Sequence, residues 1–326
     1  MFKSAKPLFL IVETSLHAGS GSDLGIVDLP IQREKHTGYP KIESSGIKGA
    51  IREIFRTQPN LQTLERGWDI SSVEDEHYKH GVNLAFGPDT ADQGNLHAGA
   101  LGFTDARLLL FPVKSVSGVF GWVTCPAVLE RFKHDLSICK PSITFDFSPP
   151  QENQVPTDSA LIVNDNKIVL EEYTFEVLAT DDCKNLANWI ANNCMPSDDV
   201  YRYWRDKIQN SLAVLSNDDF RDFVTLSTEV IARIKIDQKT RTVEKGALWY
   251  EEYLPSDSIL YSIALASPIF QENDNDKGIF QLTGQERSEK RDESKKVIEF
   301  LEDGLPSVIQ IGGNATIGKG IVRTKI

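Results

Sequence analysis

The chain is poor in cysteine, and its four cysteines fall into no spacing that binds metal. Cys125, Cys139, Cys183 and Cys194 are scattered through 326 residues, and no CxxC pair occurs. Structural zinc sites use closely spaced cysteine and histidine ligands, so this pattern argues against one. We expect reduced thiols that are partly buried.

Long apolar runs are also missing. No stretch approaches the roughly 20 apolar residues of a membrane-spanning helix. The start, MFK, leads into the strand-like PLFLIV, which is too short for the apolar part of a signal peptide plus a cleavage site. With 40% hydrophobic and 25% charged residues, the composition is that of an ordinary globular protein. We therefore expect a cytoplasmic protein that binds no membrane.

A net positive charge is absent, since the chain carries −12, and this argues at first against binding to nucleic acid. The charge is unevenly distributed, however. Residues 31–56, 233–250 and 312–326 each carry a net +3, which leaves −21 on the rest. An acidic body with three basic segments is compatible with a localised anion-binding groove, although chance clustering of solvated charge would give the same counts.

The most informative stretch is residues 16–56. It begins with a loop rich in glycine and serine, followed by Asp28 and then by a basic loop with Arg33 and Lys35. Glycine allows positive φ and lets the backbone approach another molecule closely. Asp28 has two interpretations: it shapes the turn before Pro30, or it binds a divalent metal or transfers a proton at an RNA phosphate.

An amphipathic helix is predicted at the end of this stretch. Ser44 or Ser45 can cap it, and apolar residues recur at helical spacing, namely Ile47, Ala50, Ile51, Ile54 and Phe55. Lys48, Arg52 and Arg56 are four residues apart and line one face. A solvated helix face is the ordinary explanation, but the link to the glycine loop favours a track for RNA phosphates.

The C-terminal string GNATIGKG, residues 313–320, nearly spells a phosphate-binding loop. Gly320 stands where Ser or Thr would hold magnesium, and no helix follows in the six remaining residues. No strand–helix–strand unit follows either, so a dinucleotide site is also excluded. What remains is a glycine-rich hairpin, which is either a tight structural turn or a backbone surface for phosphates next to Lys319 and Arg323.

Strand-like and helical segments alternate irregularly along the rest of the chain. Strands are expected near residues 7–14, 100–111, 117–124, 229–236, 246–253 and 260–266, and helices are expected from Pro126, Asp181 and Asn217. Trp122, Trp249 and Tyr250 lie in apolar strands and are expected in the core. Because no regular strand–helix–strand series occurs, the pattern favours the α+β class.

The segments HAGSGSDLGIVDLPIQREKHTGYP, SSGIKGAIR and IQIGGNATIGKGIV resemble the signatures of the RAMP superfamily of CRISPR proteins. Within it, the match is to the backbone subunit of type III-B (Cmr) effector complexes, and GFTDARLLLFPVKSVSGVFGWVTCP and GALWYEEYLP are also similar. The resemblance implies a ferredoxin-like (RRM-like) core with large insertions, described as palm, thumb and fingers. One domain over residues 1–326 is expected. It would carry an irregular insertion with no more than one short helix at about 58–98, a thumb at about 236–248 and a mobile loop at about 271–296.

In that family the aspartate of this motif cuts target RNA, so the resemblance implies that Asp28 is catalytic and binds a divalent metal, Mg²⁺ or Mn²⁺. His17, Glu251 and Tyr253 are further catalytic candidates. His17 could instead order the loop or bind phosphate, and Glu251 and Tyr253 could be a surface carboxylate and a strand aromatic. RNA binding is implied for Gly19, Gly21, Ser22, Arg33, Lys35, Lys48, Arg52, Arg56, Gly312, Gly313, Gly318, Lys319 and Gly320.

The resemblance thus implies a subunit that binds CRISPR RNA, packs in several copies along it and cuts complementary target RNA as a metal-dependent endoribonuclease. Its implied partners are CRISPR RNA, target RNA, further copies of itself, a polymerase-like large subunit, a small subunit and other RAMP proteins. One alternative is a guide-binding scaffold without nuclease activity, against which Asp28 counts. Another is a standalone ribonuclease that processes repeat RNA and uses a histidine such as His17.

Overall fold

The computed structural model describes residues 2–22, 25–88, 97–139, 143–145 and 148–326. Its α-helices are α1 (Ser44–Thr57), α2 (Leu61–Trp68), α3 (Glu76–Phe86), α4 (Pro126–Leu136), α5 (Asp181–Asn193), α6 (Arg202–Asn210), α7 (Asn217–Leu226), α8 (Gly284–Ser288) and α9 (Glu293–Gly304). The 3-10 helices are η1 (Ser137–Cys139), η2 (Asp199–Tyr201), η3 (Asp274–Phe280) and η4 (Ala315–Ile317).

The first eight strands are β1 (Ser4–Val12), β2 (Lys41–Ile42), β3 (Leu101–Phe103), β4 (Ala106–Lys114), β5 (Phe120–Thr124), β6 (Gln154–Pro156), β7 (Ile162–Asn164) and β8 (Lys167–Leu170). The others are β9 (Tyr173–Glu176), β10 (Leu178–Thr180), β11 (Leu212–Val214), β12 (Glu229–Ile236), β13 (Val243–Tyr253), β14 (Ile259–Ala266), β15 (Val308–Gln310) and β16 (Ile321–Lys325). Helices and strands are mixed without a regular series, which confirms the α+β class.

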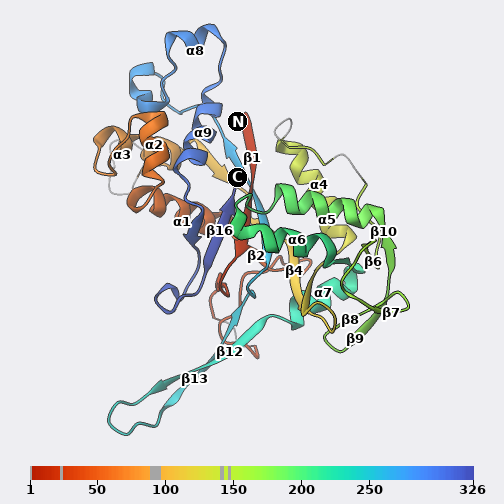
Figure 1. Ribbon diagram of the computed structural model, residues 1–326. Helices are drawn as coiled ribbons and strands as arrows, with labels where there is room; N and C mark the ends of the chain where they lie inside the picture. The colour runs from red at the N-terminus through yellow and green to blue at the C-terminus, as the bar shows by residue number, and fades with distance from the viewer. Residues whose placement is uncertain (1, 23–24, 89–96, 140–142, 146–147) are drawn as a thin grey trace.

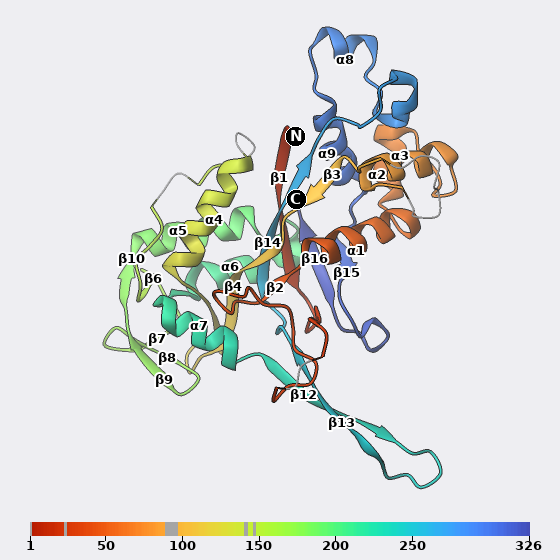
Figure 2. The same ribbon diagram turned by 180° about the vertical axis from the view of Figure 1, so that it is seen from behind.

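A large mixed sheet runs through the molecule, with helices on both sides of it (Figures 1 and 2). Within the described residues it has 11 strands, in the order β10-β6-β11-β5-β4-β14-β1-β16-β15, with β2 on β4 and β3 on β14. A three-stranded sheet, β7-β8-β9, and a two-stranded hairpin, β12-β13, are separate from it. The hairpin projects well beyond the body in both views.

The centre of the large sheet is the antiparallel set β16-β1-β14-β4. On one face, Phe132 of α4 packs against Phe9 of β1 and against Tyr261, the residue that faces Phe9 on β14. Helix α9 packs against the same two strands, and Figure 1 shows α1 and α9 on the side away from α4. Because both faces are covered, β1 reads as a continuous apolar run and is buried from Leu8 to Val12.

Residues 58–98 are more regular than the sequence analysis expected. They form two helices, α2 and α3, and residues 89–96 lie outside the described part of the chain. Leu64 and Tyr78 are buried, because these helices pack with α1 and α9 around a cluster of aromatic rings that includes Phe55 and Phe300. The expectation of an irregular insertion with no more than one short helix was therefore wrong.

Residues 271–296 contain η3, α8 and the first turn of α9, where a mobile loop was expected. Thr283 begins α8 with a capping box, in which its side chain and that of Glu286 each accept from the other residue's backbone amide. Lys277 pairs with Asp274 and with Glu293, at 2.9 and 2.7 Å. The segment thus has local order, and its mobility stays a prediction.

All four cysteines are buried and free, in agreement with the expectation of reduced thiols. Burial raises the pKa of Cys139 to about 12, which makes it unreactive at neutral pH. None of the helices in the described residues is both long and apolar enough to cross a membrane.

Candidate functional site

Asp28 lies in a bend that is attached to the base of the projecting hairpin. The backbone amide of Tyr250, on β13, donates to Asp28 Oδ2 at 2.7 Å. On either side of that contact, the Leu29 amide donates to the Tyr250 carbonyl and the Glu252 amide donates to the Leu29 carbonyl, both at 3.0 Å. Asp28 is half-buried, so one carboxylate oxygen is oriented by the backbone while the group still meets solvent.

The glycine-rich loop before Asp28 folds back on itself. The Ser20 amide donates to the Pro30 carbonyl at 3.0 Å, and the Gln32 amide donates to the Ala18 carbonyl at 2.8 Å. The Gln32 side chain also donates to the carbonyl of Gly19 at 3.0 Å. Gly19 and Ser20 are therefore held at a fixed distance from the bend, and both are exposed.

His17 stands at the start of this loop and contacts β13. Its Nδ1 lies 2.7 Å from the carbonyl oxygen of Glu252, and because a carbonyl only accepts, this nitrogen carries the proton. In the neutral ring Nε2 is then the acceptor. The ring is tilted against that of Tyr253, with 5.5 Å between centroids. This contact orders the loop, one of the roles expected for His17, and leaves Nε2 with a lone pair for proton transfer.

Glu251 and Tyr253 form the centre of a buried hydrogen-bond network. The Glu251 carboxylate accepts from the Tyr253 hydroxyl, from Trp249 Nε1 at 2.9 Å and from Arg233 Nε at 3.2 Å. The Asn314 amide also donates to Glu251, at 3.0 Å. Although burial opposes the charge, the hydrogen bonds from Tyr253, Trp249 and Arg233 together hold the pKa of Glu251 below its usual value.

Burial, together with the neighbouring Glu251 carboxylate, raises the pKa of Tyr253 above its usual value. Tyr253 is thus a neutral donor at physiological pH, and the pair carries one negative charge. The interpretation of Glu251 as a surface carboxylate was wrong, because its side chain is largely enclosed. Trp122 is buried as expected, whereas Tyr250 is 40% exposed and does not belong to the core.

Arg33 holds the loop to the scaffold from the opposite side of β13. Its guanidinium pairs with the Glu252 carboxylate and donates to the carbonyls of Gly38 and Val224, at 2.7 and 2.9 Å. The same carboxylate accepts from the amide of Ile31 at 3.0 Å. These contacts account fully for a structural role of Arg33, and its contact with RNA stays a prediction.

The C-terminal glycine-rich loop, residues 312–320, closes the site from a third direction. The Gly313 amide donates to the His17 carbonyl at 2.9 Å. Gly312 has φ 82°, and a Cβ there would overlap the His17 carbonyl oxygen, so this position requires glycine. The Lys319 ammonium lies 4.9 Å from the centroid of the Tyr253 ring. The structure thus brings His17, Lys319 and the Glu251–Tyr253 pair together from three separate parts of the sequence, and Asp28 is hydrogen-bonded to the same strand at Tyr250.

Comparison with known proteins agrees with this architecture. The family model described as "RAMP superfamily" matches residues 9–323. The chain belongs to the RAMP superfamily. It is 36% identical over 313 residues to "CRISPR system Cmr endoribonuclease Cmr4" of Pyrococcus furiosus, with 96% of this chain and 92% of that protein covered.

Among solved structures, this RAMP protein is similar to the one described as "Crystal structure of oligomeric Cmr4 from Pyrococcus furiosus". The TM-score is 0.63 and the identity 29%, over 98% of this chain and 96% of that one. It also shares its fold with a chain in "Cryo-EM structure of the Type III-B Cmr-beta bound to cognate target RNA". There the TM-score is 0.69 and the identity 23%, over 99% and 97% of the two chains.

The basic helix of this RAMP protein is only partly available to a ligand. Lys48 is half-buried and donates to the Leu101 carbonyl on β3 at 2.9 Å. Burial, with a contribution from Arg52, lowers the pKa of Lys48. Arg52 and Arg56 are half-buried, and Lys35, on the loop before the helix, is exposed. The expected phosphate track along α1 stays a prediction, with a structural role already evident for Lys48.

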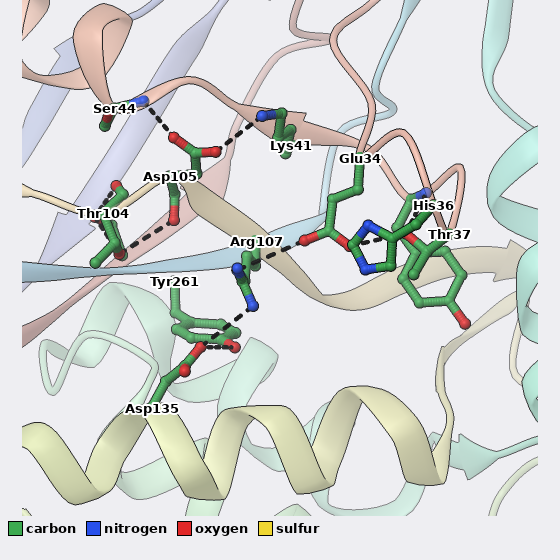
Figure 3. A network of polar contacts seen from close by, with 12 residues as sticks. Glu34, His36, Thr37, Lys41, Ser44, Thr104, Asp105, Arg107, Asp135 and Tyr261 are labelled. Atoms are coloured by element: carbon green, nitrogen blue, oxygen red, sulfur yellow. Dashed lines mark hydrogen bonds and ion pairs between the residues drawn. The ribbon is translucent and has the colours of Figure 1, made fainter.

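A polar network fixes the far end of the basic loop on the sheet (Figure 3). Arg107 of β4 lies between Glu34 of the loop and Asp135 of α4, at 3.5 and 3.7 Å. Beside it, Asp105 accepts from Lys41 at 2.8 Å and from the first amide of α1, that of Ser44, at 2.9 Å. The loop that carries Asp28 is therefore anchored on β13 at one end and on β4 and α1 at the other.

The sequence analysis missed three members of the site, namely Trp249, Arg233 and Asn314. Each contributes a donor to the Glu251–Tyr253 pair. Arg233 was counted only within a basic segment, and Asn314 only within the glycine string. Their role depends on the pairing of β12 with β13 and on the path of the glycine loop, for which no short-range sequence signal exists.

Proposed function

We propose that this chain is the backbone subunit of a type III-B RNA-guided complex, which binds CRISPR RNA in several copies and cuts complementary target RNA. The observation that carries the proposal is the position of Asp28. Its carboxylate is held by the β13 backbone at the base of a projecting hairpin, on the strand that carries Glu251 and Tyr253 and that His17 contacts. The 36% identical relative is named an endoribonuclease, and its alignment spans nearly the whole of both chains.

RNA supplies its own nucleophile, so the protein needs few catalytic groups. The 2′-hydroxyl oxygen attacks the adjacent phosphorus, the bond from phosphorus to the 5′-oxygen breaks, and a 2′,3′-cyclic phosphate and a 5′-hydroxyl result. Asp28 receives the proton of the 2′-hydroxyl, and a protonated group or water returns one to the leaving oxygen. Lys319 lies beside the Glu251–Tyr253 pair and offsets phosphate charge.

A divalent ion, Mg²⁺ or Mn²⁺, is the proposed cofactor. In the described ranges no three His, Cys, Asp or Glu side chains gather into a site that could hold a metal by themselves. Mg²⁺ is often held by one or two carboxylates together with substrate phosphates, and the half-buried Asp28 carboxylate fits such a shared site. When bound, the ion would stabilise negative charge on the phosphate.

The ferredoxin-like core is proposed to consist of β1, α1, β4, β14, α9 and β16. Two features support it: the order β16-β1-β14-β4 with antiparallel neighbours, and the position of α1 after β1 and of α9 between β14 and β16. This is the arrangement of a β-α-β-β-α-β fold. The remaining helices and the small sheets are then insertions into that core.

The projecting hairpin is proposed as the thumb. On one face its cross-strand pairs are apolar and exposed, namely Ala232 with Tyr250, Ile234 with Leu248 and Ile236 with Val243. An exposed apolar face on a hairpin that projects from the core could insert between stacked bases of a guide–target duplex. Each copy would then distort the duplex at its own Asp28, while base pairing supplies the sequence specificity. The partners would be guide and target RNA, further copies, the large and small subunits and other RAMP proteins, in the cytoplasm.

The test is cleavage of complementary RNA by the assembled complex, with Asp28→Asn against the parent. The substitution keeps the shape and removes the charge, so cutting should fall by about 10²–10⁴-fold while assembly persists. Asp165→Asn, in the turn between β7 and β8, is the matched control and should cut normally. Removing divalent metal with a chelator should also abolish cutting by the parent.

Parental cutting by Asp28→Asn would refute the catalytic assignment. If the parent binds guide RNA but does not cut with any divalent metal, the scaffold without nuclease activity becomes the better description.

A further inference from the structure

Asn314, on the C-terminal glycine-rich loop, donates hydrogen bonds from its side chain to both members of the Glu251–Tyr253 pair. Its Nδ2 donates to Glu251 Oε2 at 3.0 Å and to the Tyr253 hydroxyl at 2.8 Å. The orientation of the amide follows from chemistry, because a carboxylate only accepts and the NH₂ group must face it. Asn314 has φ 65°, a left-handed conformation that asparagine tolerates better than most residues.

The hydrogen bond from Asn314 fixes the direction of the Tyr253 hydroxyl. A tyrosine hydroxyl donates once and accepts about twice. Tyr253 accepts from Asn314 and, at 2.9 Å, from Arg233 Nη2, so both acceptor positions are used and its proton is directed at Glu251. If Asn314 moved away, one acceptor position would open and the hydroxyl could rotate.

We propose that Asn314 is a positioning residue that fixes the Glu251–Tyr253 pair and couples it to the glycine-rich loop. This inference rests on the proposed function, since it assumes that the loop contacts RNA and that the pair lies at the cleaved strand. RNA phosphates bound by the loop would then change the hydrogen bonding of the Glu251–Tyr253 pair through the Asn314 side chain.

The loop has the connections that such coupling requires. Its backbone is joined to His17 by the Gly313 amide, and the Lys319 amide donates to the Asn314 carbonyl at 3.3 Å. The charged and titratable groups around the pair come from three elements: Arg233 from β12, Lys319 from the loop and His17 from the N-terminal segment. A shift of the loop therefore changes hydrogen bonding and charge at the pair together.

Two substitutions distinguish the effect of the Asn314 side-chain donor from the effect of the shape of the loop. Asn314→Gly removes the side chain and keeps the left-handed backbone, which glycine adopts without strain. Asn314→Asp keeps size and backbone preference but replaces the donor with a carboxylate that repels Glu251. If only loop shape mattered, Asn314→Asp would be the milder change; if the donor matters, it is the more severe one. Asn166→Gly, at φ 60° in the turn between β7 and β8, is the matched control.

The first readout needs no activity. Trp249 donates its indole N–H to the same Glu251 carboxylate, so its NMR signal in the free protein reports on the position of that group. The signal can be assigned with Trp249→Phe. We expect it to shift in both Asn314 variants, while the indole signal of Trp122, which donates to the Asp257 carbonyl, stays in place. The Asn166→Gly control should leave both signals unchanged.

The second readout is the cutting rate of the assembled complex at saturating target, measured apart from target affinity. We expect Asn314→Gly to lower the rate by about 10- to 100-fold, the scale of a displaced catalytic group, with guide affinity within about twofold of the parent. Asn314→Asp should be slower still. An unchanged Trp249 signal, a parental rate, or a loss of guide binding equal to the loss of rate would each overturn the inference.

A parent complex that does not cut would contradict the proposed function. In that case the Trp249 signal alone would decide whether Asn314 positions the pair.

Discussion

Glu251 and Glu252 are neighbours on β13 and point to opposite faces of the strand, so their replacement should lower the stability of the protein to different extents. The Glu252 carboxylate is 7% exposed and accepts from three donors: the Arg33 guanidinium, the Ile31 amide at 3.0 Å and the Thr228 hydroxyl at 2.8 Å. Glu252→Ala should therefore lower the free energy of unfolding. The functional loss should follow from displacement of the Asp28 loop.

The loss in the free energy of unfolding for Glu252→Ala can be estimated from these contacts. Breaking a buried ion pair by removing one partner costs about 3–5 kcal/mol. Here the Arg33 side chain is 22% exposed and keeps two carbonyl acceptors, which places the expected loss near the lower end, at about 3 kcal/mol. Apart from the ion pair, most of the loss of stability comes from the Ile31 amide. This amide belongs to a residue that is only 4% exposed, and it would lose its acceptor.

The assay is equilibrium unfolding in urea of the parent, Glu252→Ala, Arg33→Ala and the double variant. Glu251→Gln is the matched comparison on the same strand. It should lose about 1–2 kcal/mol, since an amide oxygen at the Oε2 position still accepts from Asn314 and Arg233, while the Trp249 indole loses the acceptor that Oε1 supplied. Because Arg33 and Glu252 share one interaction, the double variant should lose clearly less than the sum of the singles. A loss below about 1 kcal/mol for Glu252→Ala, or additivity within about 0.5 kcal/mol, would refute the reasoning.

Two further predictions concern RNA. Replacing Arg52 and Arg56 with Gln should weaken guide binding and reduce the salt slope, log Kd against log salt, by about 1.4 if each contacts one phosphate. Lys48→Met should instead lower stability, because Lys48 donates to the Leu101 carbonyl, and should leave the slope unchanged; equal slopes in all variants would exclude the phosphate track. On guide RNAs of increasing length, native mass measurement should show stepwise addition of copies, and a stoichiometry independent of length would contradict the backbone role.

The parts of the fold that local chemistry decides were predictable from the sequence. Helix α1 spans Ser44–Thr57, where the apolar spacing predicted a helix. The expectation that Ser44 or Ser45 caps it was wrong, because the N-cap residue is Glu43, whose side chain makes no capping hydrogen bond. The turn between β7 and β8 uses Asp165 and Asn166 with positive φ, as their composition suggests. Gly312 and Gly320 have φ values of 82° and 74°, which suit the glycine-rich turn expected there.

The long-range contacts were beyond such reasoning. Asp28 meets Tyr250, more than 200 residues away, through a backbone amide that any residue type would supply, so no side-chain pattern marks the contact. Helices α2 and α3 were missed for another reason. Leu61, Leu64 and Trp68 do recur at helical spacing in α2, but the polar run and the glycines around them suggested a loop. Tertiary packing on Phe55 and Phe300 decided in favour of helix.

One member of each basic segment, Arg33, Arg233 or Lys319, contacts a residue of β13. The net charge counted for the three segments nevertheless overstates the electrostatic attraction that they offer to an RNA. Arg33, Arg233 and Arg323 form ion pairs with Glu252, Glu251 and Glu13 respectively, so much of their charge is neutralised within the protein. Within the residues that the structure covers, Lys35, Lys239, Arg241, Lys245 and Lys319 form no ion pair with a carboxylate. They lie on the basic loop, at the hairpin tip and on the glycine-rich loop. The chain therefore divides its cations between two tasks: Arg33 and Arg233 hold the groups around the Asp28 bend in place, and in the proposed function the cations without a carboxylate partner would supply the long-range attraction for RNA that an acidic body otherwise lacks.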